Sequence, residues 1–177
     1  MDMKKSALII IDIQNVYFEK GRYYLPYAKI AVKNAVKILT SWREENRTVI
    51  HVKHQFKILV DAKRLNEIHH KVAPLTNEIV IEKKYPNSFL KTDLLKILQE
   101  INISNVVIIG MMSNMCVDTT VRACQSYGIK VTVAQDACAA LPIKFGGEEF
   151  DANTVHKIFM GALDGTFAKV VNTEEII

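Results

Sequence analysis

The chain has 177 residues, of which 49% are hydrophobic and 24% charged, and its formal net charge is +4. This size and balance predict one globular domain over residues 1–177, with enough apolar residues for a full core. The basic residues occur as pairs such as Lys4-Lys5 and not as a run with interleaved aromatics, which argues against nucleic acid as a partner. No apolar segment is long enough to span a membrane, so a membrane partner is not expected either.

The cysteines are three in number and show no Cys-x-x-Cys spacing. A disulfide framework or a zinc knuckle is therefore not expected, and reduced thiols favour a cytoplasmic location. The N-terminal apolar run is shorter than that of a signal peptide, ends at Asp12 and is followed by no small-residue cleavage site.

Short apolar runs alternate along the chain with helical stripes, in which apolar residues recur every three or four positions. The runs are rich in β-branched residues and too short for helices, so they predict strands buried on both faces. In chain order, the predicted strands are 7–11, 48–54, 78–82, 106–109, 130–134 and 168–171. The predicted helices are about 26–46, 92–101, 117–128 and 155–163.

Strands that alternate with helices predict right-handed βαβ units and a parallel sheet. The expected fold is therefore α/β and doubly wound, with a six-stranded parallel sheet and helices on both faces. If the strand order is 3-2-1-4-5-6, the first and fourth strands are neighbours at the switch point, where such sheets bind ligands. Two connections, 55–77 and 138–150, are predicted loops. The first allows a short helix and has the length of a lid or binding loop.

Three chemically active residues follow strand ends: Asp12 after the first strand, Lys83 after the third, and Cys116 between the fourth strand and its helix. The carboxyl ends of parallel strands meet at one edge of a sheet, so these side chains are expected to converge. In the first turn of a helix, the macrodipole favours a thiolate and free N–H groups can bind an oxyanion. A carboxylate can take and return the thiol proton, and an ammonium group favours both anions.

Each of these residues also has an ordinary explanation. A lone cysteine is more often a small buried hydrophobe. An aspartate after a strand is often a turn or cap residue, and a lysine in that place is usually solvated surface. The prediction of a site therefore depends on the combination of three strand ends and not on any one residue.

Four segments make the chain resemble the isochorismatase-like cysteine hydrolases. They are ALIIIDIQN at 7–15, EKKYPNSF followed by TDL at 82–94, GMMSNMCVDTTVRA at 110–123 and DACA at 136–139. The segment around the cysteine is highly specific in combination, and the resemblance covers nearly the whole chain.

The resemblance implies the strand order given above and a catalytic set of Asp12, Lys83 and Cys116. It also implies a cis peptide between Met111 and Met112. The backbone amides of Met112 and Cys116 would then face an oxyanion.

The family lysine lies six residues before a phenylalanine, here Phe89, so the resemblance selects Lys83 over Lys84. Asn114 stands where many relatives carry histidine. Side chains near these motifs are candidates for a substrate pocket, although each is equally compatible with ordinary core or loop packing. The candidate pocket residues are Gln14, Tyr17, Phe18, Phe89 and Asn114.

Nicotinamidases of the family bind a metal through an Asp-x-His on the second strand, whereas the matching stretch here is Val52-Lys53-His54. His54 could be a lone ligand, but one histidine without a carboxylate partner is more often a plain polar residue. His69 and His70 are adjacent, so on a helix they would point apart. Neither a metal nor another cofactor is expected, and nicotinamide is disfavoured as the substrate.

The main hypothesis is a cysteine-dependent hydrolase that cleaves a small amide or other C–N substrate through a thioester intermediate. Family members that cleave the isochorismate vinyl ether lack the cysteine, so Cys116 favours C–N hydrolysis. The alternatives are a non-catalytic oligomeric binding or scaffold protein on the same fold, and a metal-dependent nicotinamidase. A nucleotide-binding protein is least favoured, because no GxGxxG or GxxxxGK[ST] follows a strand. The expected partners are a small-molecule substrate and, by the resemblance, further copies in a homo-oligomer (dimer or tetramer).

Overall fold

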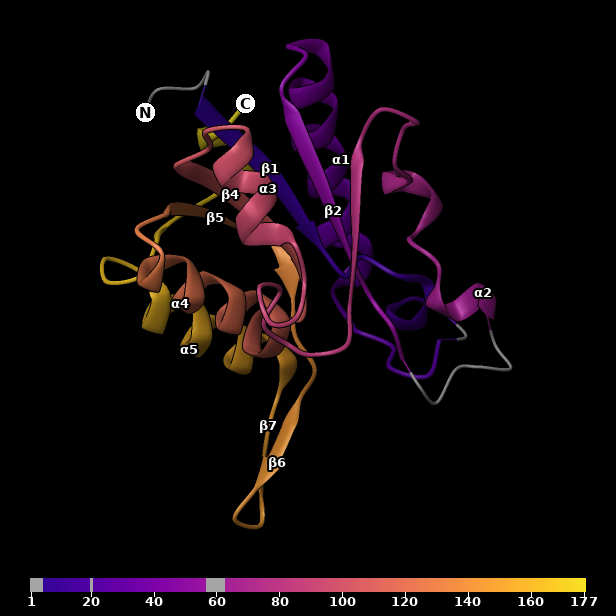
Figure 1. The fold of residues 1–177 in the computed structure, drawn as a ribbon. Helices are drawn as coiled ribbons and strands as arrows, with labels where there is room; N and C mark the ends of the chain where they lie inside the picture. Colours follow the sequence, from indigo (N-terminus) through magenta and orange to yellow (C-terminus); the bar gives the residue numbers. More distant parts are fainter. Residues whose placement is uncertain (1–4, 20, 57–62) are drawn as a thin grey trace.

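A computed structural model describes residues 5–19, 21–56 and 63–177. The strands are β1 Ser6–Ile11, β2 Thr48–His54, β3 Ile79–Lys83, β4 Asn105–Met111, β5 Lys130–Ala139, β6 Ile143–Phe145, β7 Glu148–Phe150 and β8 Lys169–Val171. The α-helices are α1 Ala28–Glu44, α2 Lys63–Asn66, α3 Leu94–Glu100, α4 Asp118–Ser126 and α5 Ala152–Leu163. Six strands form one parallel sheet in the order β3-β2-β1-β4-β5-β8, with helices on both sides (Figure 1). This order confirms the predicted doubly wound α/β fold.

The side chains of β1 alternate between the two faces of the sheet and divide the core in two. On one face, Leu8 and Ile10 pack against α1, whose apolar stripe includes the fully buried Trp42. On the other face, Ile9 and Ile11 share a cluster with apolar residues of α3, α4 and α5. Every residue of β1 is buried, as its uninterrupted apolar sequence predicts for a central strand of a parallel sheet. Within the described residues, no helix has the length and apolar character needed to cross a membrane.

The fifth strand, predicted over 130–134, continues to Ala139. Its register against β4 shifts between Ile108 and Gly110, and the pairing then resumes with Gly110 opposite Cys138. Polar residues fall in this irregular stretch, so the apolar pattern stops before the strand does.

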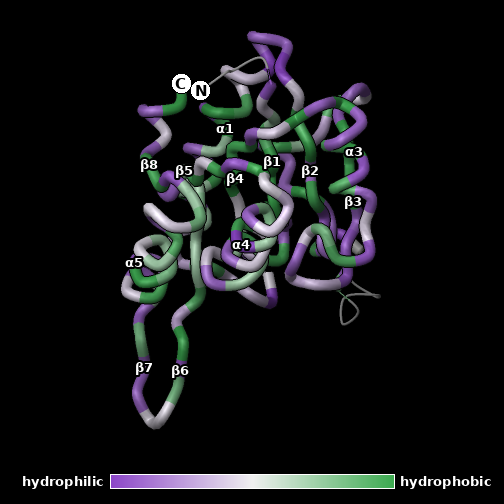
Figure 2. The backbone as a smooth tube through the Cα atoms, turned by 60° about the vertical axis from the view of Figure 1, so that its left-hand side comes forward, coloured by the Kyte–Doolittle hydropathy of each residue, from purple (hydrophilic) through white to green (hydrophobic). Residues whose placement is uncertain are grey.

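The connection over 138–150, predicted as a loop, contains the antiparallel hairpin of β6 and β7. Its two-residue turn consists of Gly146 and Gly147, which both have positive φ, as the tightest hairpin turns require. Figures 1 and 2 show this hairpin extending away from the sheet and its helices.

The connection over 55–77 contains α2 and a 3-10 turn at His70–Val72, and its residues 57–62 lie outside the described part of the chain. The prediction that His69 and His70 point apart is wrong, because their ring centroids are 4.3 Å from one another. His69 has an extended backbone and only His70 enters the turn, so helical geometry does not separate the two rings.

Gly110 of β4 lies directly opposite Ile11 of β1 and has a φ of +136°. A Cβ added to Gly110 would lie 2.0 Å from the carbonyl oxygen of Ile11. We expect Gly110→Ala to lower the free energy of unfolding by roughly 3 kcal/mol or more, because both the backbone angle and the backbone contact resist the new methyl group.

The matched control is Gly128→Ala, since Gly128 has a φ of +68° but nothing within 4 Å of an added Cβ. This substitution should lower the free energy of unfolding by only about 1 kcal/mol, the strain of a left-handed residue alone. Urea denaturation measures both changes, and equal losses would contradict the argument from close approach.

Candidate active site

Asp12, Lys83 and Cys116 meet at the carboxyl edge of the sheet, although three separate elements supply them. Asp12 follows β1, Lys83 ends β3, and Cys116 lies in a π-helical turn, Ser113–Val117, between β4 and α4. Lys83 Nζ donates a hydrogen bond to Asp12 Oδ2 at 2.6 Å, and both side chains are fully buried. A carboxylate oxygen of Asp12, the sulfur of Cys116 and a ring nitrogen of His54 lie within 4.8 Å of one another.

Strand geometry determines which of the two adjacent lysines, Lys83 or Lys84, faces the site. Successive side chains of a strand point to opposite sides, and along β3 Lys83 is buried whereas the next residue, Lys84, is exposed. The register of β3 against β2 places Lys83 opposite His54. Lys83 is therefore the lysine that contacts Asp12, as the family spacing indicates.

The Cys116 thiol carries its proton in the free protein. Burial raises the pKa of this thiol to about 12, Asp12 adds to the rise, and Lys83 opposes it. The expectation that a helix N-terminus favours a thiolate here is therefore wrong. Cys116 is only 6% exposed, and the loss of hydration is the largest cause of the rise.

The two oxygens of Asp12 differ in their surroundings. Oδ2 accepts the hydrogen bond from Lys83, whereas Oδ1 is buried without a hydrogen-bond partner among the described residues. Burial raises the pKa of the Asp12 carboxyl, and the positive charge of Lys83 opposes this rise. An unpaired carboxylate oxygen beside a protonated thiol is placed to accept a proton.

Gln14, a predicted pocket residue, uses its side-chain amide to join the ends of two strands. Its Nε2 donates to the carbonyl oxygens of His54 at 3.0 Å and Asn66 at 2.7 Å. Its Oε1 accepts the backbone N–H of His54 at 2.8 Å. The side chain is buried and clamps the end of β2 to the segment that follows β1.

Tyr17 and Phe18, also predicted for the pocket, lie in different surroundings. Tyr17 is buried near the site: burial, and then the electrostatic influence of Asp12 and Cys116, raise the pKa of its hydroxyl. Phe18 instead stacks on His69, with 4.0 Å between ring centroids. It lines a hollow of about 840 Å³ whose described walls include none of the three converging residues.

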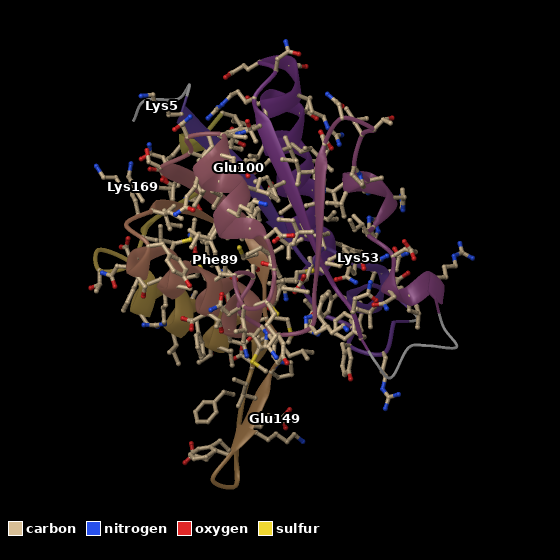
Figure 3. All side chains as sticks on the ribbon, in the orientation of Figure 1. Lys5, Lys53, Phe89, Glu100, Glu149 and Lys169 are labelled. Carbon is tan, nitrogen blue, oxygen red and sulfur yellow. The ribbon has the colours of Figure 1, made fainter. Side chains whose placement is uncertain are left out.

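Phe89 and Asn114 complete the predicted pocket set. Phe89 lies between α3 and α4 (Figure 3), and its ring faces that of Tyr127 at 5.0 Å. It is therefore a packing residue in the described structure. Asn114 shares the π-helical turn with Cys116, and its Oδ1 is buried without a hydrogen-bond partner in the described part of the chain.

The sequence analysis did not anticipate the contacts of His54. Its Nδ1 accepts a hydrogen bond from Lys83 Nζ at 3.0 Å, because an ammonium group can only donate. Its ring packs on Phe56 at 4.6 Å, and Phe56 in turn lies 6.0 Å from the Tyr17 ring and 5.9 Å from the Tyr23 ring. The place of His54 near the site could have been predicted from the sequence, since His54 ends the second strand as Lys83 ends the third. The position of Phe56 depends on the geometry of a loop, which the sequence pattern does not predict.

Asp12, His54 and Cys116 are the only group of three metal-ligating side chains in the part of the chain that the structure describes. Their donor atoms suit Zn²⁺, but the Lys83 ammonium interacts with all three. A positive charge that is bonded to two of the donors and acts on the third opposes a divalent cation. The second strand also carries Val52 in place of the aspartate of an Asp-x-His pair, so these residues do not fit a resident metal.

The backbone leading to the sulfur has the cis peptide between Met111 and Met112 that the resemblance implies. It directly precedes the π-helical turn that carries Cys116. The role of the Met112 and Cys116 amides in binding an oxyanion stays a prediction.

Comparison with known proteins gives the family of the chain. Residues 6–175 match the family described as Isochorismatase domain. The isochorismatase family protein YddQ of Bacillus subtilis (strain 168) is 39% identical, over 97% of this chain and 98% of its own. Nicotinamidase 3 of Arabidopsis thaliana is 24% identical, over 98% of this chain and 87% of its own.

A solved structure shows the same relationship in three dimensions. The crystal structure of an isochorismatase from Pseudomonas putida KT2440 matches with a TM-score of 0.95 and 32% identity, over 100% of this chain and 92% of that one. The chain therefore belongs to the isochorismatase domain family.

Proposed function

We propose that this protein is a cysteine-dependent hydrolase that breaks the C–N bond of a small amide or carbamoyl substrate. The observation that carries the proposal is a buried thiol within 4.8 Å of a carboxylate that is hydrogen-bonded to an ammonium group and has one oxygen without a partner among the described residues. Acyl transfer needs a nucleophile, a base and charge stabilisation within reach of one another, and this edge of the sheet supplies all three.

In the first step, Cys116 Sγ attacks the carbonyl carbon while Asp12 Oδ1 takes the thiol proton. Because burial raises the pKa of the thiol to about 12, the proton leaves as the sulfur attacks and not beforehand. A sulfur with a high pKa is also the stronger nucleophile once its proton has gone. The C–N bond then breaks, Asp12 gives the proton to the nitrogen, and the amine leaves a thioester on Cys116. Lys83 holds Asp12 in place throughout.

In the second step, water attacks the thioester carbonyl and Asp12 accepts one of the water protons. The bond between carbon and sulfur breaks, the carboxylic acid departs, and the proton returns from Asp12 to Cys116. The site is then again a thiol, a carboxylate and an ammonium group.

Two relatives and one cluster of rings support a C–N substrate of small size. Nicotinamidase 3 and the ureidoacrylate amidohydrolase RutB of Cronobacter sakazakii, which is 24% identical over 67% of this chain and 68% of its own, are named for such reactions. The rings of Tyr17, Tyr23 and Phe56 group beside His54 and favour a substrate with a flat or apolar part. Nicotinamide stays disfavoured, because the second strand lacks the aspartate of the metal-binding pair.

The first prediction concerns the nucleophile. Cys116→Ala and Cys116→Ser should lower kcat/KM by at least roughly a thousandfold on any substrate found in a panel of small amides, carbamoyl compounds and ureas. The measurement is the release of ammonia or amine. Cys124→Ala is the control, because Cys124 is also buried but lies on α4 away from the ion pair. Wild-type turnover by Cys116→Ala would reject the mechanism.

The second prediction compares the thiols directly. Burial raises the pKa of Cys116, Cys124 and Cys138 alike to about 12, but of the three only Cys116 has an ammonium group beside it. Lys83 can stabilise the charge that develops on the Cys116 sulfur during alkylation, so iodoacetamide should label Cys116 at least about tenfold faster than the other two, as followed by mass spectrometry of peptides. Lys83→Met should remove most of this difference, whereas Lys84→Met should preserve it. Equal labelling of all three thiols in the wild type would favour the scaffold alternative.

The third prediction concerns pH. Asp12 must be ionised to act as the base, and burial raises its pKa from 3.8 in spite of Lys83. With an uncharged substrate, kcat/KM should fall as the pH drops through an apparent pKa above 3.8, because a protonated Asp12 cannot accept the thiol proton. The apparent value belongs to the coupled groups together. Circular dichroism over the same range separates this loss from unfolding, and an acid limb at or below 3.8 would contradict the assignment.

A further inference from the structure

The path of the Lys83 side chain is set by the order of the strands. Lys83 ends β3 and Asp12 follows β1, with β2 between them. Neighbouring strands are about 4.8 Å apart, so the lysine has to pass over the end of β2 to reach its carboxylate. The residue at that end is His54, which stands opposite Lys83 in the register.

The Lys83 ammonium finds two side-chain acceptors among the described residues. An ammonium group has three N–H donors and no acceptor, and a buried donor without a partner is unfavourable. One donor reaches Asp12 Oδ2 at 2.6 Å and a second reaches His54 Nδ1 at 3.0 Å. The positive charge of Lys83 also acts on the Cys116 thiol, where it opposes the rise in pKa. Two acceptors, at the ends of β1 and β2, thus fix the direction of the ammonium.

His54 is held in place as firmly as the group that it binds. Its backbone N–H and carbonyl both bond to the Gln14 side chain, at 2.8 Å and 3.0 Å. Its ring packs on Phe56, with 4.6 Å between centroids. Burial and then Lys83 lower the pKa of His54 to about 4, so the ring is neutral near neutral pH and Nδ1 is free to accept. The ring proton then lies on Nε2.

We propose that His54 is a positioning residue, which directs the Lys83 ammonium toward Asp12 and Cys116 by accepting its second hydrogen bond. The proposal concerns the same site as the proposed function and rests on it. His54 acts through Lys83, so its removal should change the reactivity of the sulfur and not only the stability of the fold.

Three substitutions at position 54 test this role. His54→Asn puts an amide oxygen near the place of Nδ1, His54→Gln carries its amide farther out, toward Nε2, and His54→Leu keeps bulk without an acceptor. The readout is the rate at which iodoacetamide labels Cys116 across a pH series, which requires no substrate. His54→Leu and His54→Gln should label Cys116 at least about tenfold more slowly, equal to a rise of about one unit in its apparent pKa. His54→Asn should stay within about threefold of wild type.

The matched control is His70→Asn, because His70 is an exposed histidine of the 55–77 connection. It should label as wild type does. Thermal unfolding identifies any variant that does not fold, and if His54→Leu fails, the comparison of His54→Asn with His54→Gln decides. The inference about His54 would be overturned, and the proposed function left standing, if His54→Gln or His54→Leu labelled Cys116 at the wild-type rate. Equal decreases of the labelling rate in His54→Asn and His54→Gln would have the same consequence. If wild-type Cys116 labels no faster than Cys124, the proposed function and the inference both fail.

Discussion

The buried ion pair of Lys83 and Asp12 is the interaction on which the rest of the site depends. Both side chains are withdrawn from water, and such a pair is tolerated only when its remaining donors and acceptors also find partners. The fold meets this condition for the ammonium, which also donates to His54, by ending neighbouring strands at one edge: β1 leads to the carboxylate, β3 carries the ammonium, and β2 lies between them. On the carboxylate, Oδ1 has no hydrogen-bond partner among the described residues. A strand order that placed β3 one position farther from β1 would put the carboxylate beyond the reach of the lysine. The sheet topology is therefore a requirement of the chemistry.

The same burial explains why the sulfur keeps its proton. Lys83 alone would favour a thiolate, but the loss of hydration raises the pKa of Cys116, and the charge of Asp12 disfavours a second negative charge beside it. The site thus holds one negative charge that can lie on oxygen or on sulfur, with the ammonium bonded to the oxygen and acting electrostatically on the sulfur. In the proposed reaction this charge passes from Asp12 to the sulfur and then to the substrate oxygen, while Lys83 stays fixed. Such an arrangement favours the movement of charge during attack over a thiolate that exists beforehand.

The sequence predicts the sheet well because strands buried on both faces leave uninterrupted apolar runs, and a polar residue that ends such a run marks the edge of the sheet. Asp12, Lys83 and Cys116 were accessible to this reasoning for that reason. The role of Gln14 was not, because its bonds to His54 join residues 40 positions apart and follow from the register between strands. The direction in which the pKa of the Cys116 thiol shifts could not be predicted from the sequence either. The position of Cys116 before a helix is visible in the sequence, whereas its desolvation depends on what the surrounding elements cover. Local position alone therefore suggested the wrong direction for the shift.

A carboxylate, an imidazole and a thiol within 4.8 Å of one another form a donor set that Zn²⁺ can bind in other surroundings. The two kinds of cation would act on the sulfur in opposite ways. A divalent metal removes the proton of a thiol that coordinates it and keeps the sulfur as a ligand. An ammonium group supplies one positive charge and directed N–H bonds, and it leaves the sulfur protonated until a base takes the proton. Lys83 is hydrogen-bonded to two of these donors and acts electrostatically on the third, and in the proposed reaction the sulfur is then available for bonding to carbon. One lysine at the end of β3 thus favours the proposed nucleophile and base over a metal site in this group of side chains.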